Sequence, residues 1–294
     1  MSFSVMTDTS GNLPQSLILD NNLRVIPFSY YIDGKEYNTV KDPFFDAEDF
    51  YARIRRGMKV TTSQIPPQQY ADFFETELRE GNDVIFVAMS SGISGSCNSA
   101  QIAARMMMDA YPGRIVEVID TRGASLGEGI IALHAARIKK AGLGTLDAIA
   151  ELRDHVEQMF NVFTVDDLMH LRRGGRLSNL SAVVGSVLQI KPLLKGNEEG
   201  KIVAFSKVRG RKKSIETLAE YYDKLVVNPD RQIVGIAQAA CREDAAKLAE
   251  LLQRNNPPKE ILTVEYEPVT GCHVGPGALA LFFESSVGVR SFGN

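Results

Sequence analysis

Short apolar runs alternate with helical patterns through the first half of the chain. The runs FSVMTD, LRVIPFSYYI (followed by a turn at GKEY), DVIFVAMS and RIVEVIDT each predict a strand. The segments between and after them, DAEDFYARIRRG, PPQQYADFFETELREG, SGSCNSAQIAARMMMDAYPG and GEGIIALHAARIKKAG, predict helices. DVIFVAMS is almost continuously apolar, which is typical of a strand that helices cover on both faces. This alternation with short links predicts a parallel sheet with right-handed crossovers.

After about residue 160 the pattern becomes a mixture of strands and helices. NVFTV and KIVAFSKVR read as strands, while SNLSAVVGSVLQ, KKSIETLAEYYDKLV and EDAAKLAELLQRN read as helices; RQIVGIAQAA and EILTVEYEP complete the pattern. We therefore predict an α/β fold with an N-terminal parallel-sheet domain over 1–160 and a C-terminal mixed-sheet domain over 161–294. A cleft between two domains is the default place for a ligand.

Composition narrows the class of protein. The 294 residues are 44% hydrophobic and 23% charged with a net charge of −3, so we expect a globular protein without a nucleic-acid partner. Three scattered cysteines and four histidines form neither a disulfide framework nor a metal-ligand spacing. The N-terminus does not resemble a signal peptide, and no apolar run is long enough to span a bilayer. We expect a cytoplasmic protein without a metal or cofactor.

Three loops are rich in hydroxyl groups. In VIFVAMSSGISGS, Val84–Ser96, an apolar strand leads into four serines and two glycines without a charge. A helix that begins near Ser96 would direct its free N–H groups at an anion, although the loop lacks both the G-x-S-x-G pattern and the lysine of a P-loop. VTTSQIPP presents Thr61, Thr62 and Ser63, and TDTSGNLP presents a similar polar set. Taken alone, each of these two loops is more typical of a cap for the helix that follows it.

Three further segments carry cations or a histidine. LMHLRRGGRLSN surrounds two glycines with arginines and predicts the end of a short helix at Leu171, and KVRGRKKS holds five cations in eight residues. Guanidinium groups bind carboxylates and phosphates, although such charges are often only solvated. In GCHVGPGALALFF, His273 stands on a glycine-rich turn, where it could donate a hydrogen bond or carry a proton near neutral pH.

These motifs occur together, and in the same order, in one known family. TDTSGNLP, TTSQIP, SSGISGS, IDTRGASLGEG, DLMHLRRGGRLS, IKPLL, KVRGRKKS and GCHVGPGALAL resemble the DegV family over essentially the full chain. The resemblance implies a bacterial protein of phospholipid metabolism that binds a long-chain fatty acid such as palmitate in a tunnel between its two domains. It also implies that the protein is not an enzyme alone but carries the acid to a separate ATP-dependent fatty acid kinase subunit, which phosphorylates the carboxylate.

The resemblance also implies site residues. Thr62 and Ser94 hold the carboxylate, with Ser63, Gly95 and His273 beside it. Further arginines handle phosphate or dock the kinase subunit: Arg173, Arg176 and Arg209. Two positions depart from the family pattern: Asn12 replaces an acidic residue, and Gln238 stands where many members have a histidine, so the roles of those residues are not carried over.

Elementary energetics agrees with a site built from uncharged groups. A chain of about fourteen buried methylenes contributes roughly 11 kcal/mol before ordering costs, so no strong ion pair is needed to hold the acid. Neutral hydroxyls orient a carboxylate and leave an oxygen able to attack ATP. Candidate lining residues are apolar: Phe28, Phe86, Phe163, Leu281, Phe282 and Phe283. Two alternatives stay open here: an acyl hydrolase or transferase that uses Ser94 and His273, and a lipid-responsive regulatory protein that docks a partner through Lys207–Lys213.

Overall fold

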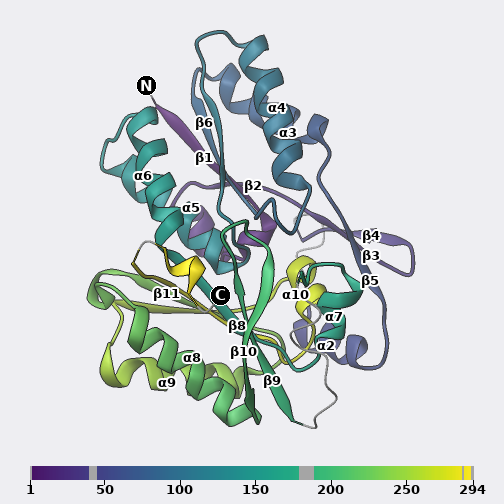
Figure 1. The fold of residues 1–294 in the computed structure, drawn as a ribbon. Coiled ribbons are helices and arrows are strands. Elements are labelled where there is room, and N and C mark those ends of the chain that lie inside the picture. Colours follow the sequence, from purple (N-terminus) through teal and green to yellow (C-terminus); the bar gives the residue numbers. More distant parts are fainter. Residues whose placement is uncertain (1, 40–44, 179–188, 287, 293–294) are drawn as a thin grey trace. The chain divides into compact units, whose positions relative to one another are not determined.

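The structure, a computed structural model, describes residues 2–39, 45–178, 189–286 and 288–292 (Figure 1). The chain divides into two compact units: a first unit of Met1–Phe44 and Thr61–Val156, and a second unit of Phe45–Val60 and Glu157–Asn294. A single boundary near residue 160 does not describe this division, because Phe45–Val60 groups with the second unit although it precedes residue 160. Its helix α2 (Ala47–Arg55) belongs to the second unit because the buried Tyr51 hydroxyl donates to the Tyr266 carbonyl at 2.7 Å. Independent domains over 1–160 and 161–294 stay a prediction.

The first unit contains a four-stranded parallel sheet, as predicted. Its strands are β1 (Phe3–Asp8), β2 (Arg24–Ile26), β6 (Asp83–Ala88) and β7 (Val116–Asp120), in the order β2-β1-β6-β7. Every residue of β1 and β6 is buried, which explains their nearly unbroken apolar sequences. The single strand predicted over LRVIPFSYYI is wrong, because β2 ends before Pro27 and β3 (Ser29–Ile32) joins another sheet. Proline has no N–H to donate, so it cannot continue the ladder.

Helices cover this sheet on both faces (Figure 1). Helices α3 (Pro67–Arg79) and α4 (Ser96–Ala110) lie together on one face, and α5 (Leu126–Lys140) and α6 (Thr145–Gln158) on the other. A short helix, α1 (Gln15–Asp20), and a 3-10 turn, η1 (Thr9–Gly11), follow β1. Helix α6 has no counterpart among the predicted elements. The other long helices lie where their apolar periodicity predicts them.

A small sheet has the order β4-β3-β5, with β4 (Lys35–Tyr37) and β5 (Val60–Ser63) on either side of β3. Strands β3 and β4 form an antiparallel hairpin in which Tyr30 pairs with Tyr37, and the two rings stack at 5.5 Å. The segment VTTS is therefore a strand and does not cap α3, whose N-cap position is taken by Pro66 without a side-chain hydrogen bond. Thr62 and Ser63 are therefore fixed by the pairing of β5 with β3.

The second unit contains a mixed six-stranded sheet, as predicted. Its order is β10-β9-β8-β13-β11-β12, and only the β11–β12 pair is parallel among the strand pairs described. The strands are β8 (Met159–Thr164), β9 (Ile190–Gly196), β10 (Ile202–Arg209), β11 (Ile233–Gln238), β12 (Glu260–Glu265) and β13 (Leu279–Glu284). The long helices α8 (Arg211–Leu225) and α9 (Arg242–Asn255) lie side by side (Figure 1). Their apolar faces share one core with Phe160, Leu281 and Phe283.

Short elements complete the second unit: α7 (Met169–Arg173), α10 (Pro268–Val274) and the 3-10 turns η3 (Pro229–Arg231) and η4 (Val289–Ser291). Helix α7 continues two residues beyond the predicted end at Leu171. Gly175, with φ 72°, takes the left-handed conformation that follows it. The helix predicted over SNLSAVVGSVLQ falls on residues 179–188, which lie outside the described residues.

Candidate functional site

The order of strands in the first unit points to the carboxyl ends of β1 and β6 as a place for a ligand. The chain moves outward in one direction from β1 to β2 and in the other from β6 to β7, so the order reverses between β1 and β6. Open α/β sheets bind ligands at the carboxyl ends of the strands at such a reversal. The loops that leave this point are TDTSGNLP after β1 and SSGISGS after β6. Both loops are rich in hydroxyl groups.

The segment TTSQIP meets the SSGISGS loop within the first unit. Gly95 lies against the Gln64 side chain so closely that an added Cβ would overlap the Gln64 carboxamide. The Ile65 amide donates to the Ser96 hydroxyl at 3.1 Å. Thr62 and Ser94 therefore stand on two segments that contact each other, although they are 32 positions apart in the printed sequence.

The serines of this loop are not equivalent. Ser91 donates its hydroxyl hydrogen to Asp120 Oδ2 at 2.5 Å, and the Ser96 hydroxyl accepts from Ile65. Ser94 Oγ accepts from the Ser96 amide at 3.2 Å, and its own hydrogen has no acceptor within the described part of the chain. Ser94 can therefore donate a hydrogen bond to a ligand without giving up a structural contact.

Helix α4 begins at Ser96, as predicted, and no side chain caps its first turn. Its first N–H groups and positive dipole end are therefore placed beside Ser94 and Gly95. In β5, Ser63 Oγ lies 3.5 Å from the Tyr31 hydroxyl, so a second hydroxyl pair stands next to Thr62. Thr62, Ser63, Ser94 and Gly95 themselves carry no charge, and their role in ligand binding stays a prediction.

His273 lies in the second unit, on the last turn of α10 rather than on a glycine-rich loop. The turn that follows contains Gly275 and Gly277, at φ 76° and 84°. A Cβ on Gly174 would lie 2.7 Å from His273 Nδ1, so the R-G-G-R segment and the histidine are in contact. Burial and then the nearby Arg176 lower the pKa of His273 to about 4. The imidazole is neutral at pH 7, which favours a hydrogen-bond donor over a proton carrier.

The predicted arginines differ in their surroundings. Arg173 is exposed at the end of α7, while Arg176 is half-buried and donates to the Gly174 carbonyl. Arg209 is exposed at the end of β10. The next arginine, Arg211, instead bonds Asp244 Oδ2 at 2.7 Å. Of the five cations in KVRGRKKS, Arg211 is thus half-buried and paired with an acidic residue, while the other four are exposed.

The two departures from the family pattern have structural roles. Gln238 is buried at the end of β11, where its amide donates to Glu265 at 2.6 Å and its carbonyl accepts from the Cys241 amide. In the first loop, Asp8 caps η1 by accepting from the Ser10 amide at 2.8 Å. Asn12 takes the left-handed conformation at φ 54° and donates to the Ser125 hydroxyl. Local capping therefore accounts for the contact of Asp8 with the Ser10 amide, whereas Asn12 joins this loop to a distant segment.

A buried pair of carboxyl groups beside the first loop was not predicted. Glu128, in the first turn of α5, is fully buried and bonds Thr7 and Ser10, which are 121 and 118 positions away in the chain. Ser10 also bonds Asp8. The sequence G-E-G at the start of α5 is the one local feature that points to this burial of Glu128. Its second glycine, Gly129, allows the helix to approach the loop closely.

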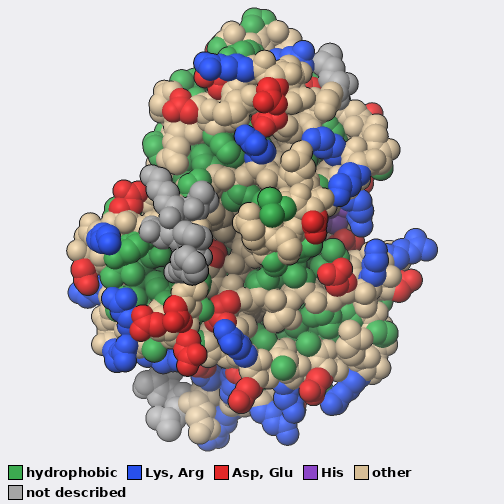
Figure 2. Space-filling view, turned by 180° about the vertical axis from the view of Figure 1, so that it is seen from behind, with side chains coloured by type: hydrophobic (Ala, Val, Ile, Leu, Met, Phe, Trp, Pro, Cys, Tyr) green, Lys and Arg blue, Asp and Glu red, His purple; other side chains and the backbone are tan. Residues whose placement is uncertain are grey.

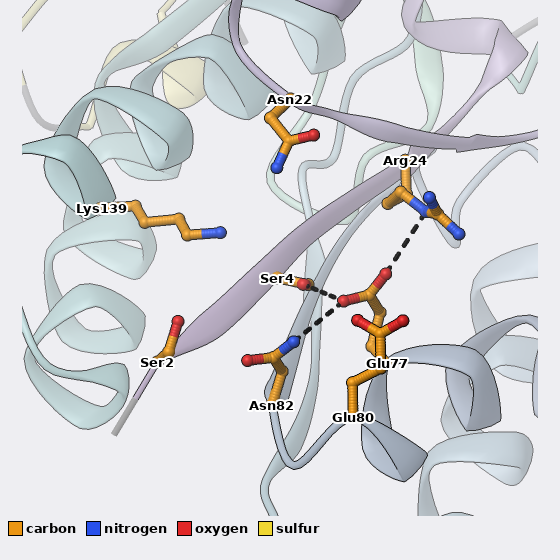
Figure 3. Close-up of a pocket in the computed structure, with 8 residues that line it drawn as sticks. All are labelled: Ser2, Ser4, Asn22, Arg24, Glu77, Glu80, Asn82 and Lys139. Atoms are coloured by element: carbon orange, nitrogen blue, oxygen red, sulfur yellow. Dashed lines mark hydrogen bonds and ion pairs between the residues drawn. The ribbon is translucent and has the colours of Figure 1, made fainter.

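A polar cavity of about 270 Å³ lies elsewhere in the first unit (Figure 3). It is lined by Ser2, Ser4, Asn22, Arg24, Glu77, Glu80, Asn82 and Lys139, around the amino-terminal half of β1. Its buried Glu77 is bonded by Ser4 and Asn82 and paired with Arg24 at 3.3 Å. None of the predicted site residues lines this cavity, and its polar walls offer little surface to an acyl chain.

Comparison with known proteins places these features in a family. The profile of the DegV family of uncharacterised proteins matches residues 2–286. A DegV domain-containing protein of Clostridium perfringens is 36% identical over 281 residues, which cover 96% of this chain and 97% of that protein. The chain belongs to the DegV family. The resemblance drawn from the ordered motifs is thereby confirmed.

Solved structures of DegV proteins share the fold. A fatty-acid-binding DegV family protein from Thermus thermophilus has a TM-score of 0.88 and 30% identity, covering 97% of this chain and 100% of that one. DegV from Bacillus subtilis, a fatty acid binding protein, has a TM-score of 0.82 and 32% identity with the same coverage.

The surface of this family member carries mixed charge. Blue and red side chains are interspersed on the face shown in Figure 2, in keeping with a net charge of only −3. Among the described residues, no helix is both long and apolar enough to cross a membrane. The apolar candidates include core residues: Phe86 packs against Tyr70 and Phe74, while Leu281 and Phe283 belong to the core of the second unit.

Proposed function

We propose that this protein binds a long-chain fatty acid and holds its carboxylate through Thr62 and Ser94. The observation that carries the proposal is the match, at 30% and 32% identity over 97% of the chain, to two DegV proteins that bind fatty acids. The local chemistry supports it. Ser94 has a hydroxyl hydrogen to donate, and the segment with Thr62 contacts its loop.

A carboxylate at this place needs hydrogen bonds rather than a counter-ion. Hydrogen bonds to a charged group contribute about 1.5–3 kcal/mol each, while the buried acyl chain supplies most of the affinity. The first turn of α4 adds a positive dipole end without adding a cation. Ser63, Gly95 and the neutral His273 stay predicted head-group residues on the same reasoning.

Extraction of the ligand tests the proposal directly. Protein purified from a bacterial host should release a C16 to C18 acid in a molar ratio near one after denaturation, measured by mass spectrometry. An empty protein that also takes up no added palmitate would count decisively against fatty-acid binding.

Substitution tests the assigned hydroxyls. Removing one hydroxyl, in Thr62→Val or Ser94→Ala, should weaken palmitate binding by about 10- to 150-fold, which corresponds to the loss of one charge-assisted hydrogen bond. Ser91→Ala is the matched control in the same loop, because Ser91 donates to Asp120 and should leave the affinity unchanged. Equal losses in all three variants would point to a general disturbance of the loop and contradict the assignment.

We further propose that the bound acid is presented to a separate ATP-dependent fatty acid kinase subunit. Exposed cations on the second unit, Arg173 and Arg209, support a docking or phosphate-handling role together with Arg176. Charge reversal at Arg209 should abolish phosphorylation by the kinase subunit and ATP while palmitate binding stays intact. Arg231→Glu, at an exposed arginine of η3, is the control for net charge. Normal acyl-phosphate formation by the Arg209→Glu variant would exclude that arginine from docking.

A further inference from the structure

Four polar side chains form a buried chain of hydrogen bonds between β1, η1 and α5. Thr7, Asp8, Ser10 and Glu128 are all at most 2% exposed. Thr7 Oγ1 donates to Glu128 Oε1 at 2.9 Å, and Ser10 Oγ lies 2.7 Å from Glu128 Oε2. Ser10 Oγ also makes a short hydrogen bond with Asp8 Oδ1, which accepts from the Ser10 amide as well.

A count of the available hydrogens determines which of these four side chains is protonated. The Ser10 hydroxyl carries one hydrogen but bonds two carboxyl oxygens, so one of the two carboxyl groups must supply the second hydrogen. Asp8 Oδ1 already accepts from the Ser10 amide, which makes Asp8 the acceptor and Glu128 the donor. We propose that Glu128 is a positioning residue that keeps its proton at neutral pH and donates it to Ser10, which donates in turn to Asp8.

The surroundings favour this arrangement. Burial raises the pKa of Asp8 to about 6, and burial together with the Asp8 charge raises the pKa of Glu128 well above its ordinary value. The other titratable groups that face the pair are Tyr70 of α3 and Cys97 of α4, and the pKa of each is raised, so both are neutral. The N-terminal end of α5 favours an anion at Glu128, but full burial beside a second carboxylate opposes it.

This hydrogen-bonded proton connects the TDTSGNLP loop after β1, called the first loop here, to helix α5. The connection lies at the carboxyl ends of the strands, where the strand order reverses between β1 and β6. Gly129 of α5, the residue after Glu128, lies directly against the Gly11 carbonyl, so the helix and the loop are also in contact through their backbones. Thr9, between Asp8 and Ser10, accepts from the Phe28 amide at 3.0 Å and extends the connection to the segment after β2. Loss of the Glu128 proton would place two negative charges on one hydroxyl and release the loop. For ligand affinity, this inference rests on the proposed function.

Infrared spectroscopy tests the proton on the protein alone. The difference spectrum between wild type and Glu128→Gln at about pH 7 should contain the C=O band of a protonated carboxylic acid. Glu250→Gln, at an exposed position of α9, is the control and should change only carboxylate bands. If Glu128→Gln does not fold, the carboxyl ¹³C shift of Glu128 in labelled wild-type protein decides the same question. A carboxylate signal from Glu128 in either measurement overturns the proposal.

Palmitate affinity as a function of pH tests the positioning role. In wild type the affinity should fall several-fold as the pH rises above neutral and the proton is lost, because burial raises the pKa of Glu128 well above its ordinary value. Glutamine reproduces both hydrogen bonds of the neutral acid and cannot ionise, so Glu128→Gln should bind as wild type does at neutral pH and lose the pH dependence. Glu128→Ala should bind weakly throughout. An unchanged pH profile in Glu128→Gln contradicts the positioning role, whereas absence of palmitate binding in wild type contradicts the proposed function and leaves the infrared result to decide the protonation.

Discussion

Alanine at Gly129 should destabilise the first unit, because the position has no room for a Cβ. The added atom would overlap the Gly11 carbonyl oxygen and lie 2.9 Å from Leu13 Cδ2. The leucine side chain can rotate, but the carbonyl belongs to the backbone of η1, which the buried hydrogen bonds of Ser10 hold in place. Helix and loop must therefore separate.

The size of the effect follows from two opposing contributions. Forcing an extra carbon into a packed contact costs about 1–3 kcal/mol. Alanine is a better helix former than glycine by about 0.8–1 kcal/mol, which offsets part of that cost. Because the opposing atom belongs to the backbone and cannot rotate away, we place the first cost in the upper half of its range, at about 2–3 kcal/mol. The free energy of unfolding should then fall by about 1–2 kcal/mol, corresponding to a decrease in Tm of about 3–6 °C for a unit of this size.

Urea unfolding followed by far-UV circular dichroism measures this change, since the chain contains no tryptophan for fluorescence. Gly144→Ala is the control, because its new Cβ would meet only Asp147 Oδ2 at 3.7 Å, an ordinary contact. The control should stay within about 0.5 kcal/mol of wild type. If Gly129→Ala is as stable as wild type or more stable, α5 and the first loop do not approach as closely as described.

Three other substitutions test separate parts of the structure. Burial lowers the pKa values of the stacked His134 and His155 from 6.5 to about 4 and about 3, so the unfolded chain binds more protons below pH 6.5. Stability should therefore fall as the pH decreases from about 6.5 to 4, and His155→Phe should reduce that slope in urea titrations. Tyr51→Phe leaves the buried Tyr266 carbonyl without its donor and should cost about 1–3 kcal/mol, measured by thermal unfolding. Gln238→Leu removes the acceptor of the Cys241 amide and should cost a similar amount, whereas a neutral result would show that water replaces the side chain.

Strands and long helices could be predicted from the sequence because their signals are local. The fully buried β1 and β6 are apolar runs, and α3, α4 and α5 have periodic apolar faces with clear ends. The single strand over LRVIPFSYYI fails for an equally local reason, the proline inside it. The loop hydroxyls at the ends of β1 and β6 were also predictable, since polar residues after buried strands of a parallel sheet indicate a ligand edge.

Contacts between distant segments could not be predicted in this way. Glu128 reads as an ordinary acidic residue in the first turn of a helix, where it would be charged and solvated. Its burial beside Asp8 follows only from how α5 lies on the first loop, across more than a hundred residues of chain. The assignment of Phe45–Val60 to the second unit has the same origin, because the contact of Tyr51 with Tyr266 joins segments 215 positions apart.

The serines of the SSGISGS loop show what a structure adds to a motif. As sequence, they are alike, and the family resemblance alone selects Ser94. Hydrogen bonds and burial together separate three of them. Ser91 donates its hydroxyl hydrogen to Asp120. Ser96 accepts from the Ile65 amide and is only 1% exposed, whereas Ser94 accepts from the Ser96 amide and is half-buried, so its hydroxyl hydrogen is the one that a ligand can reach. A carboxylate can accept that hydrogen without disturbing the loop. The accessibility of its hydroxyl group and the family resemblance both favour Ser94, which stays a prediction, and the contrast between Ser94→Ala and Ser91→Ala tests it.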